Sequence, residues 1–305
     1  MDPVPPRVAR PVLTGASGFI GSALASRLGS ARRLALGARD WRESLATLDL
    51  RDATIFHLAA RVHERPGESA EQVFEADNVD KTLALAKAAA DAGAARLVFA
   101  STVKIHGEET AGIRWSSASP ADPRDAYARS KWQAEEGLRV IARRTGLATV
   151  VIRLPLVYGP AVGGNFRSLA TLADSGLWLP FAAIENRRSL VHVDDAVDAL
   201  LAAAMHAEAP GRAFIAAHPR AVSTPQLIET LRRCLGRPRR LFAVPATLLE
   251  WGAAACGQGA RMRRLTRSLE VDSSELGTRL GWAARVGVED GIRTIVSAMR
   301  DGPVG

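Results

Sequence analysis

The sequence has few cysteines and no long apolar run. Its two cysteines, Cys234 and Cys256, are too few for a disulfide framework and have no metal-ligand spacing, so we expect packing roles and no metal site. No run reaches the roughly 18 uninterrupted apolar residues of a membrane span, so we expect no membrane insertion. The first residues contain no apolar signal segment, and we therefore expect a cytoplasmic protein.

Lysine is scarce too, and the net charge of +8 comes almost entirely from arginine. A basic chain favours an anionic partner such as a nucleic acid, a membrane surface or a phosphorylated metabolite. The arginines are scattered, apart from a loose cluster over residues 261–267, and no basic stripe is interleaved with aromatic residues. We therefore expect no nucleic-acid partner. A nucleotide cofactor and a nucleotide-linked substrate explain the charge at least as well.

Residues 11–24 predict a strand that passes through a glycine-rich turn into a helix. The glycines follow the spacing Gly15-x-x-Gly18-x-x-Gly21. The free N–H groups and the positive end of a helix dipole at such a turn attract an anion. Glycine serves the tight turn, the close approach of a pyrophosphate and close helix–strand packing. The alternative is an ordinary strand-to-helix turn, because a chain with 26 glycines can produce this spacing by chance.

Strand and helix patterns alternate along the first half of the chain. We expect strands near 7–14, 33–37, 54–60, 96–100 and 147–154, with helices near 18–28, 71–92 and 122–144. This alternation predicts an α/β fold with a Rossmann-type doubly wound parallel sheet.

The alternation weakens beyond Pro160. Helices are expected near 163–175, 194–206, 224–235, 246–256 and 287–299, and strands near 187–192 and 213–217. We predict that residues 1–160 form an NAD(P)-binding domain to which 188–222 return. Residues 161–187 and 223–305 would form a smaller, mostly helical substrate-binding region over the C-terminal edge of the sheet.

Tyr127 and Lys131 are four residues apart on an expected helix, so they share a face. A nearby ammonium favours the phenolate and lowers a tyrosine pKa that is otherwise about 10. Such a phenol can act as a general acid or base near neutral pH. The alternative is a half-buried tyrosine beside a solvated lysine.

Hydroxyl groups follow the apolar strand near 96–100. Ser101 or Thr102 would lie at the carboxyl end of that strand, where a doubly wound sheet binds its ligand. Either hydroxyl could hold a substrate carbonyl or alkoxide oxygen against Tyr127. The alternative is a strand-end residue that satisfies the local backbone. The glycine turn, the strand-end hydroxyl and the Tyr–Lys pair occur in order, which is more specific than any one of them.

Two further strand ends are expected to hold the cofactor. Arg39 and Asp40 end the second strand, where an acid would bind the adenosine ribose hydroxyls and an arginine a 2′-phosphate. Both types are present, so NAD and NADP stay open, with a slight preference for NADP because Arg39 comes first. A solvated Arg39 is the alternative. Leu58, Ala59 and Ala60 end another strand with mostly small residues, which let a flat cofactor lie against the backbone.

These motifs together resemble extended short-chain dehydrogenases/reductases of the NAD-dependent epimerase/dehydratase family. The match covers roughly residues 8–200, through Thr14–Gly21, His57–Ala60, Asn78-Val79, Ser101–Gly107, Tyr127-x-x-x-Lys131, Arg153–Pro160 and Arg188–Asp194. The resemblance implies an NAD or NADP cofactor, Tyr127 as acid/base, Thr102 as the catalytic hydroxyl, and Lys131 on the nicotinamide ribose. It also implies cofactor contacts from Ser17, Phe19, Ile20, Asn78, Ser101, Tyr127, Leu154 and Pro155.

The same resemblance implies a sugar substrate. Asn165 and Arg188 look like contacts to the diphosphate or uracil of a nucleotide sugar. Residues 180–191 resemble bacterial 4-epimerases and 4-ketoreductases that make N-acetylated 6-deoxy sugars for surface polysaccharide. We therefore predict an epimerase or ketoreductase acting at C4 of a UDP-hexose. Dehydration ranks low, because Thr102 is followed by Val103-Lys104 and not by an acidic pair.

Two rival functions and two structural questions stay open. The rivals are an NAD(P)H-dependent reductase of a non-nucleotide ketone or aldehyde, and a non-catalytic NAD(P)-sensing protein. Family members usually have a third strand, ending in Asp-Leu or Asp-Val, where this chain has residues 41–53. Either Asp49 supplies that acid or the strand is shortened or absent. The resemblance also implies a homodimer through residues 71–92 and 124–145.

Overall fold

A computed structural model describes residues 8–63 and 69–300, apart from the side chain of Asn165. Its centre is a six-stranded sheet in the order β2-β1-β3-β4-β5-β8. All neighbouring strands are parallel, which confirms the predicted Rossmann-type sheet. The strands are β1 (Pro11–Thr14), β2 (Arg32–Leu34), β3 (Thr54–His57), β4 (Arg96–Thr102), β5 (Thr149–Leu154) and β8 (Ala213–Ile215).

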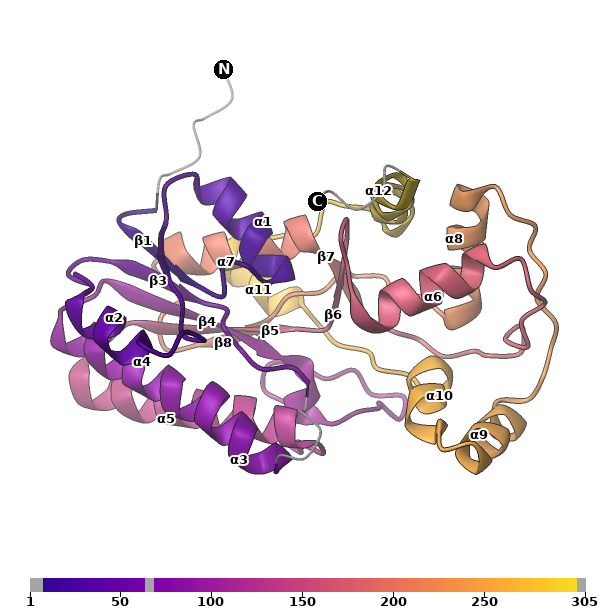
Figure 1. The fold of residues 1–305 in the computed structure, drawn as a ribbon, viewed down its shortest axis with the longest axis horizontal. Helices are drawn as coiled ribbons and strands as arrows, with labels where there is room; N and C mark the ends of the chain where they lie inside the picture. The colour runs from indigo at the N-terminus through magenta and orange to yellow at the C-terminus, as the bar shows by residue number, and fades with distance from the viewer. Residues whose placement is uncertain (1–7, 64–68, 301–305) are drawn as a thin grey trace, which may run out of the picture.

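Helices cover both faces of this sheet (Figure 1). Along β1, Leu13 packs in the cluster with α1 (Phe19–Leu28), α7 (Val193–Met205) and α11 (Ser274–Leu280). The preceding Val12 packs in the opposite cluster with α2 (Trp41–Thr47), α4 (Lys81–Asp91) and α5 (Ala126–Thr145). Successive strand side chains point to opposite faces, so a sheet covered on both sides needs continuous apolar strands.

The predicted helix over 71–92 is present as three joined helical segments. It consists of α3 (Ala70–Phe74), a π-helical turn (Glu75–Asp80) and α4. Single π-helical turns inside helices are frequent at functional sites. Here the turn holds Asn78, one of the residues predicted to contact the cofactor.

Residues 41–53 contain helix α2 and no strand, which answers the question left open by the sequence. Trp41 and Leu45, four residues apart, are both buried against the sheet. The chain then enters β3, which pairs directly with β1. Asp49 is bound to Arg10 and the backbone N–H of Arg51, so its carboxylate holds the loop before β3.

Beyond β5 the chain builds a second, mostly helical region at the far end of the molecule (Figure 1). A separate parallel pair, β6 (Leu156–Tyr158) with β7 (Leu190–His192), connects it to the sheet. Its helices are α6 (Gly164–Asp174), α8 (Thr224–Leu235), α9 (Ala246–Ala255), α10 (Gly259–Thr266) and α12 (Val288–Arg300). The sequence did not predict α2, α10 or α11.

Helix α11 bears on the predicted division of the chain into two regions. It lies within residues 223–305, yet Leu276, Leu280 and Trp282 belong to the core cluster of the sheet. The chain therefore crosses back to the sheet near its end, and the predicted two-region division remains a prediction. No helix in the described ranges combines the length and apolar character needed to cross a bilayer.

Candidate active site

The glycine turn between β1 and α1 has no room for side chains. Gly15 has a φ of +71°, and a Cβ there would lie 2.6 Å from the backbone nitrogen of Ala59. A Cβ on Gly21 would lie 1.9 Å from the carbonyl oxygen of Gly15. No side chain caps the α1 N-terminus at Gly18, so its first N–H groups stay available. The turn therefore fits the diphosphate of a dinucleotide.

A buried chain of hydrogen bonds ties this turn to the end of β3. His57 Nδ1 lies 2.7 Å from the Thr14 hydroxyl, and its Nε2 lies 2.7 Å from the Thr82 hydroxyl. Thr82 donates its proton to the carbonyl of Asn78, so the protonated ring nitrogen is Nε2 and Thr14 donates to Nδ1. Burial, followed by the charge of Lys131, lowers the pKa of His57 to about 3, which keeps the imidazole neutral.

Asn78 fixes the segment that follows β3. Its Oδ1 accepts from the backbone N–H of Arg61 at 2.7 Å, and its Nδ2 donates to the Arg61 carbonyl at 3.1 Å. The same Nδ2 donates to the hydroxyl of Ser130 on α5 at 3.0 Å. Asn78 is therefore a positioning residue between this segment and α5, and its predicted contact with the cofactor remains a prediction.

A cavity of about 820 Å³ lies past the carboxyl ends of β4 and β5. Its lining includes four of the predicted site residues, Thr102, Tyr127, Pro155 and Arg188. Thr102 is the last residue of β4, and its hydroxyl accepts from the backbone N–H of Lys104 at 3.3 Å. The structure thus brings the strand-end hydroxyl, the phenol and a substrate-binding candidate to one cavity.

Tyr127 occupies the first turn of α5, which begins after the cap residue Asp125. The Asp125 carboxylate accepts from the backbone N–H of Ala128 at 2.7 Å. The Tyr127 ring meets Phe74 edge to face, with 6.1 Å between centroids. Lys131 is buried one turn further along and does not line the cavity; its Nζ lies 4.1 Å from the centre of the Phe99 ring.

The predicted lowering of the Tyr127 pKa is wrong for this structure. Burial of the phenol, with a smaller effect of Asp125, raises the pKa of Tyr127 to about 12. Burial also lowers the pKa of Lys131 to about 7, although the charge of Glu135 opposes this shift. Desolvation therefore outweighs the attraction that spacing alone suggested. The phenol keeps its proton at neutral pH.

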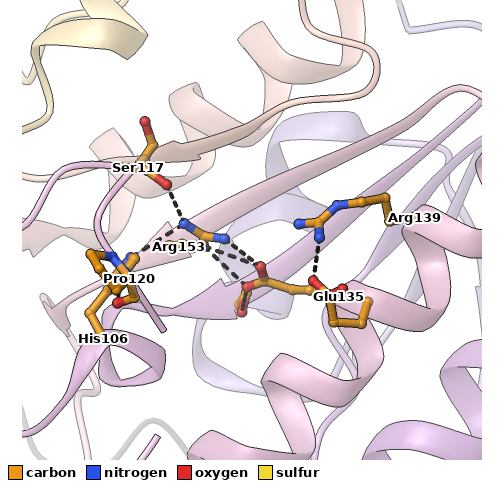
Figure 2. A network of polar contacts seen from close by, with 8 residues as sticks. His106, Ser117, Pro120, Glu135, Arg139 and Arg153 are labelled. Carbon is orange, nitrogen blue, oxygen red and sulfur yellow. Dashed lines mark hydrogen bonds and ion pairs between the residues drawn. The ribbon is translucent and has the colours of Figure 1, made fainter. Parts of the chain in front are cut away.

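Next to this pair lies a buried ion pair, drawn in Figure 2. Arg153 Nη2 and Glu135 Oε2 are 2.7 Å apart, and both side chains are almost fully buried. Arg153 also donates to the Ser117 carbonyl at 2.8 Å. The Ser101 hydroxyl donates to Glu135, whereas Thr102 lines the cavity. Since neighbouring strand residues face opposite ways, only Thr102 is positioned for a substrate.

Figure 2 also shows His106 beside Arg153. Its Nδ1 lies 3.0 Å from the Pro120 carbonyl and its Nε2 lies 3.3 Å from Arg153 Nη1. Burial lowers the pKa of His106, so the neutral ring donates from Nδ1 and accepts at Nε2. The ion pair of Arg153 and Glu135, together with His106, therefore links β4, α5 and β5 to the loop that contains Ser117 and Pro120.

The expected adenosine end of the cofactor site lies in the turn between β2 and α2. Arg39 and Asp40 are both exposed there. Arg39 forms no hydrogen bond or ion pair with any other residue in the described ranges, and Asp40 lies 3.4 Å from the Ser44 hydroxyl. Both side chains can thus reach a ribose or a 2′-phosphate, and the choice between NAD and NADP stays open.

Arg188 and four arginines that the sequence analysis did not assign line the cavity, namely Arg124, Arg263, Arg264 and Arg267. Arg188 Nη1 donates to the carbonyl of Arg267 at 3.1 Å, and burial lowers its pKa. Arg263 and Arg264 on α10 belong to the same lining. The sequence feature that could have pointed to Arg263 and Arg264 was the arginine cluster over residues 261–267. Asn165 lies in the first turn of α6, and its side chain is outside the described part of the chain.

The strand–turn–helix unit, with its glycine turn at the carboxyl end of a strand in a parallel sheet, defines a dinucleotide-binding protein. Residues 12–217 match the model of the NAD dependent epimerase/dehydratase family. The chain belongs to this family. Members of this family are enzymes that use a nicotinamide cofactor. The family assignment predicted from the sequence motifs is therefore confirmed.

Individual relatives support the same assignment. A UDP-glucose 4-epimerase from Vibrio cholerae is 31% identical over 94% of both chains. An N-acetyl-α-D-glucosaminyl-diphospho-ditrans,octacis-undecaprenol 4-epimerase from Escherichia coli O157:H7 is 28% identical over 48% of this chain and 43% of its own. The crystal structure of a UDP-glucose 4-epimerase from Thermotoga maritima with UDP-glucose is similar in fold, with a TM-score of 0.75, 22% identity and coverage of 95% and 98%.

Proposed function

We propose that the chain is an NAD(P)-dependent epimerase or ketoreductase acting at C4 of a UDP-hexose, N-acetylated or 6-deoxy. One observation carries the proposal: Thr102, Tyr127 and Arg188 line a single cavity at the carboxyl end of the parallel sheet. This is where doubly wound folds bind their ligands. The 31% identical relative, a UDP-glucose 4-epimerase, supports the same position of reaction.

The proposed roles follow from the chemistry of the side chains. A bound nicotinamide supplies a hydride acceptor and donor for the sugar carbon. Gly15, Gly18 and Gly21 would hold its diphosphate, and Lys131 its ribose. Tyr127 moves the proton of the C4 oxygen while Thr102 holds that oxygen in place. Because the phenol is protonated at neutral pH, it is suited to donate to the C4 oxygen as a ketone is reduced. In the oxidation half-reaction the same side chain has to accept the proton of the C4 hydroxyl as the phenolate.

The positive lining of the cavity suits the carrier half of such a substrate. Arg188, Arg263 and Arg264 come from two segments and lie around one space. Guanidinium groups bind diphosphates through paired, charge-assisted hydrogen bonds. These three arginines would therefore fix the diphosphate while the sugar reaches Tyr127.

A second candidate carrier is a polyprenyl diphosphate, which the name of the Escherichia coli relative specifies. The observation that favours it is helix α9, next to the arginines of α10, which has no buried residue. An apolar carrier could leave the cavity along such a surface. Both carriers present a diphosphate to the arginines. The predicted homodimer, through α3, α4 and α5, also remains a proposal.

The test uses a UDP-hexose that carries deuterium at C4, with oxidised NAD or NADP supplied. An epimerase yields the C4 epimer with deuterium retained and no net change in cofactor absorbance. A ketoreductase, working in reverse, oxidises C4 to the 4-keto sugar and passes the deuterium to the cofactor, which becomes reduced. Reduction of free ketones, with no UDP binding detected by calorimetry, would favour the first rival, a reductase of non-nucleotide ketones or aldehydes. Cofactor binding without any turnover would favour the sensing protein, and either outcome contradicts the proposal.

A further inference from the structure

Helix α9 exposes an apolar side to solvent. It packs inward through half-buried residues spaced as one helical face, namely Ala246, Leu249, Glu250 and Ala253. The opposite face carries Leu248, Trp251, Gly252 and Ala255, which are exposed. Leu248 is 56% exposed and Trp251 75%. A surface helix normally carries polar residues on the side that faces water.

This outer face of α9 carries no charge. The one charged residue of the helix, Glu250, is bound on the inner side by Arg267 at 2.6 Å and by the Thr266 hydroxyl. Two further aromatic side chains precede the helix. Trp178 and Phe242 are 65% and 45% exposed, and their segments pair side by side through the bridge between Leu179 and Leu241. Exposed aromatic and aliphatic side chains on one helix face, such as Leu248 and Trp251, mark an interaction surface.

The neighbouring helix α10 supplies positive charge. The side chains of Arg261, Arg263 and Arg264 are exposed and form no salt bridge or hydrogen bond with another residue in the described ranges. Residues 241–268 contain four arginines and one glutamate. The glutamate is already paired, so the surface of α9 and α10 presents an apolar stripe beside unpaired cations.

The chemistry of this surface fits an anionic membrane. Interfacial helices place aromatic and aliphatic residues at the boundary of the acyl chains and arginines on lipid phosphates. Protein interfaces are also enriched in aromatic residues and arginine, so a second copy of the chain is an alternative outcome of the test. Figure 1 shows α9 and α10 at one edge of the molecule, with α9 outermost, so a flat surface can reach them.

We propose that α9 and α10 form a docking surface for an anionic phospholipid membrane. Trp251 and Leu248 would enter the interfacial layer, and Arg261 would bind lipid phosphates. Arg263 and Arg264 also line the cavity, so docking would bring its mouth close to the membrane. This proposal rests on the surface alone and does not depend on which sugar carrier the enzyme uses.

The test measures co-sedimentation of the full chain with two kinds of vesicle, one of phosphatidylcholine alone and one that also contains phosphatidylglycerol. We expect binding to the anionic vesicles that weakens as salt is added. Trp251→Glu should reduce the partition coefficient about tenfold or more, because it places a charge at the bilayer boundary. Arg261→Gln should weaken binding to anionic vesicles only.

The matched control is Met205→Glu, which adds the same charge at another exposed apolar position, at the end of α7. It should bind vesicles as the wild type does. Leu248→Gln provides a second, milder variant, and circular dichroism checks that each chain is folded. Absence of wild-type binding to either vesicle would overturn the proposal. Equal binding by Trp251→Glu and Met205→Glu would overturn it too. A wild-type dimer that does not bind vesicles and that Trp251→Glu converts to monomers would also overturn the proposal.

Discussion

Lys131 lies buried against Phe99, and burial lowers the pKa of its ammonium from 10.5 to about 7. In the unfolded chain the same amine keeps a proton up to its ordinary pKa. Between those two values the unfolded state therefore binds more protons than the folded state. The free energy of unfolding must rise with pH across this window.

This shift gives a prediction for Lys131→Met. The wild-type free energy of unfolding should increase between pH 7 and 9, and the variant should lose most of that increase. The wild-type gain approaches about 1.4 kcal/mol per pH unit where the difference in protonation is complete. Urea denaturation at fixed pH values measures it. Lys87→Met, on the exposed side of α4, should keep the wild-type slope; an unchanged slope in Lys131→Met would contradict the account.

Gly21 gives a second prediction, because a Cβ there would lie 1.9 Å from the Gly15 carbonyl oxygen. Gly21→Ala should force the turn apart, lower stability by about 1–3 kcal/mol, and weaken NAD(P) binding at least tenfold. Calorimetry and denaturant titration measure the two effects. Gly252→Ala is the matched control, since a Cβ there meets nothing within 4 Å. Wild-type NAD(P) affinity in Gly21→Ala would refute the assignment of the cradle.

At the scale of elements, the pair of Arg153 and Glu135 joins β5 to α5 beside the catalytic candidates (Figure 2). Removing one partner leaves a buried charge without compensation. Arg153→Met should therefore lower the free energy of unfolding by about 3–5 kcal/mol. Arg139→Met breaks an exposed pair with Glu136 on the same helix and should change stability by less than about 1 kcal/mol. Similar losses in both variants, measured by urea denaturation, would show that burial does not govern this pair.

Elements with strong local signals were predicted well. The first strand, glycine turn and helix, and the strands that became β3, β4 and β5, have continuous apolar runs because both faces of the sheet are covered. Helix α2 was not predicted; from the sequence, residues 41–53 could hold a strand, a shortened strand or none. Its decisive contact, the packing of Trp41 and Leu45 on the sheet, depends on tertiary structure. Helices α10 and α11 are short, and their patterns are weak without their packing partners.

At the scale of the whole molecule, the site combines local motifs with contacts that spacing cannot reveal. Thr102 and Tyr127 were found from neighbouring residues and meet in the expected cavity. Arg263 and Arg264 reach that cavity from far along the chain, so only the fold shows their place. The direction of the Tyr127 pKa also depends on burial, which the sequence spacing of Tyr127 and Lys131 does not contain.

The most direct measurement compares the turnover of the UDP-hexose by Tyr127→Phe with that of the wild type. We expect a loss of about 10²–10⁴-fold, the usual contribution of a general acid or base, with NAD(P) binding and stability retained. Tyr158→Phe is the matched control at the other tyrosine, whose buried hydroxyl has no hydrogen-bond partner among the described residues. It should turn over the substrate as the wild type does. Turnover by Tyr127→Phe within a few fold of the wild type would contradict the role of Tyr127 in proton transfer.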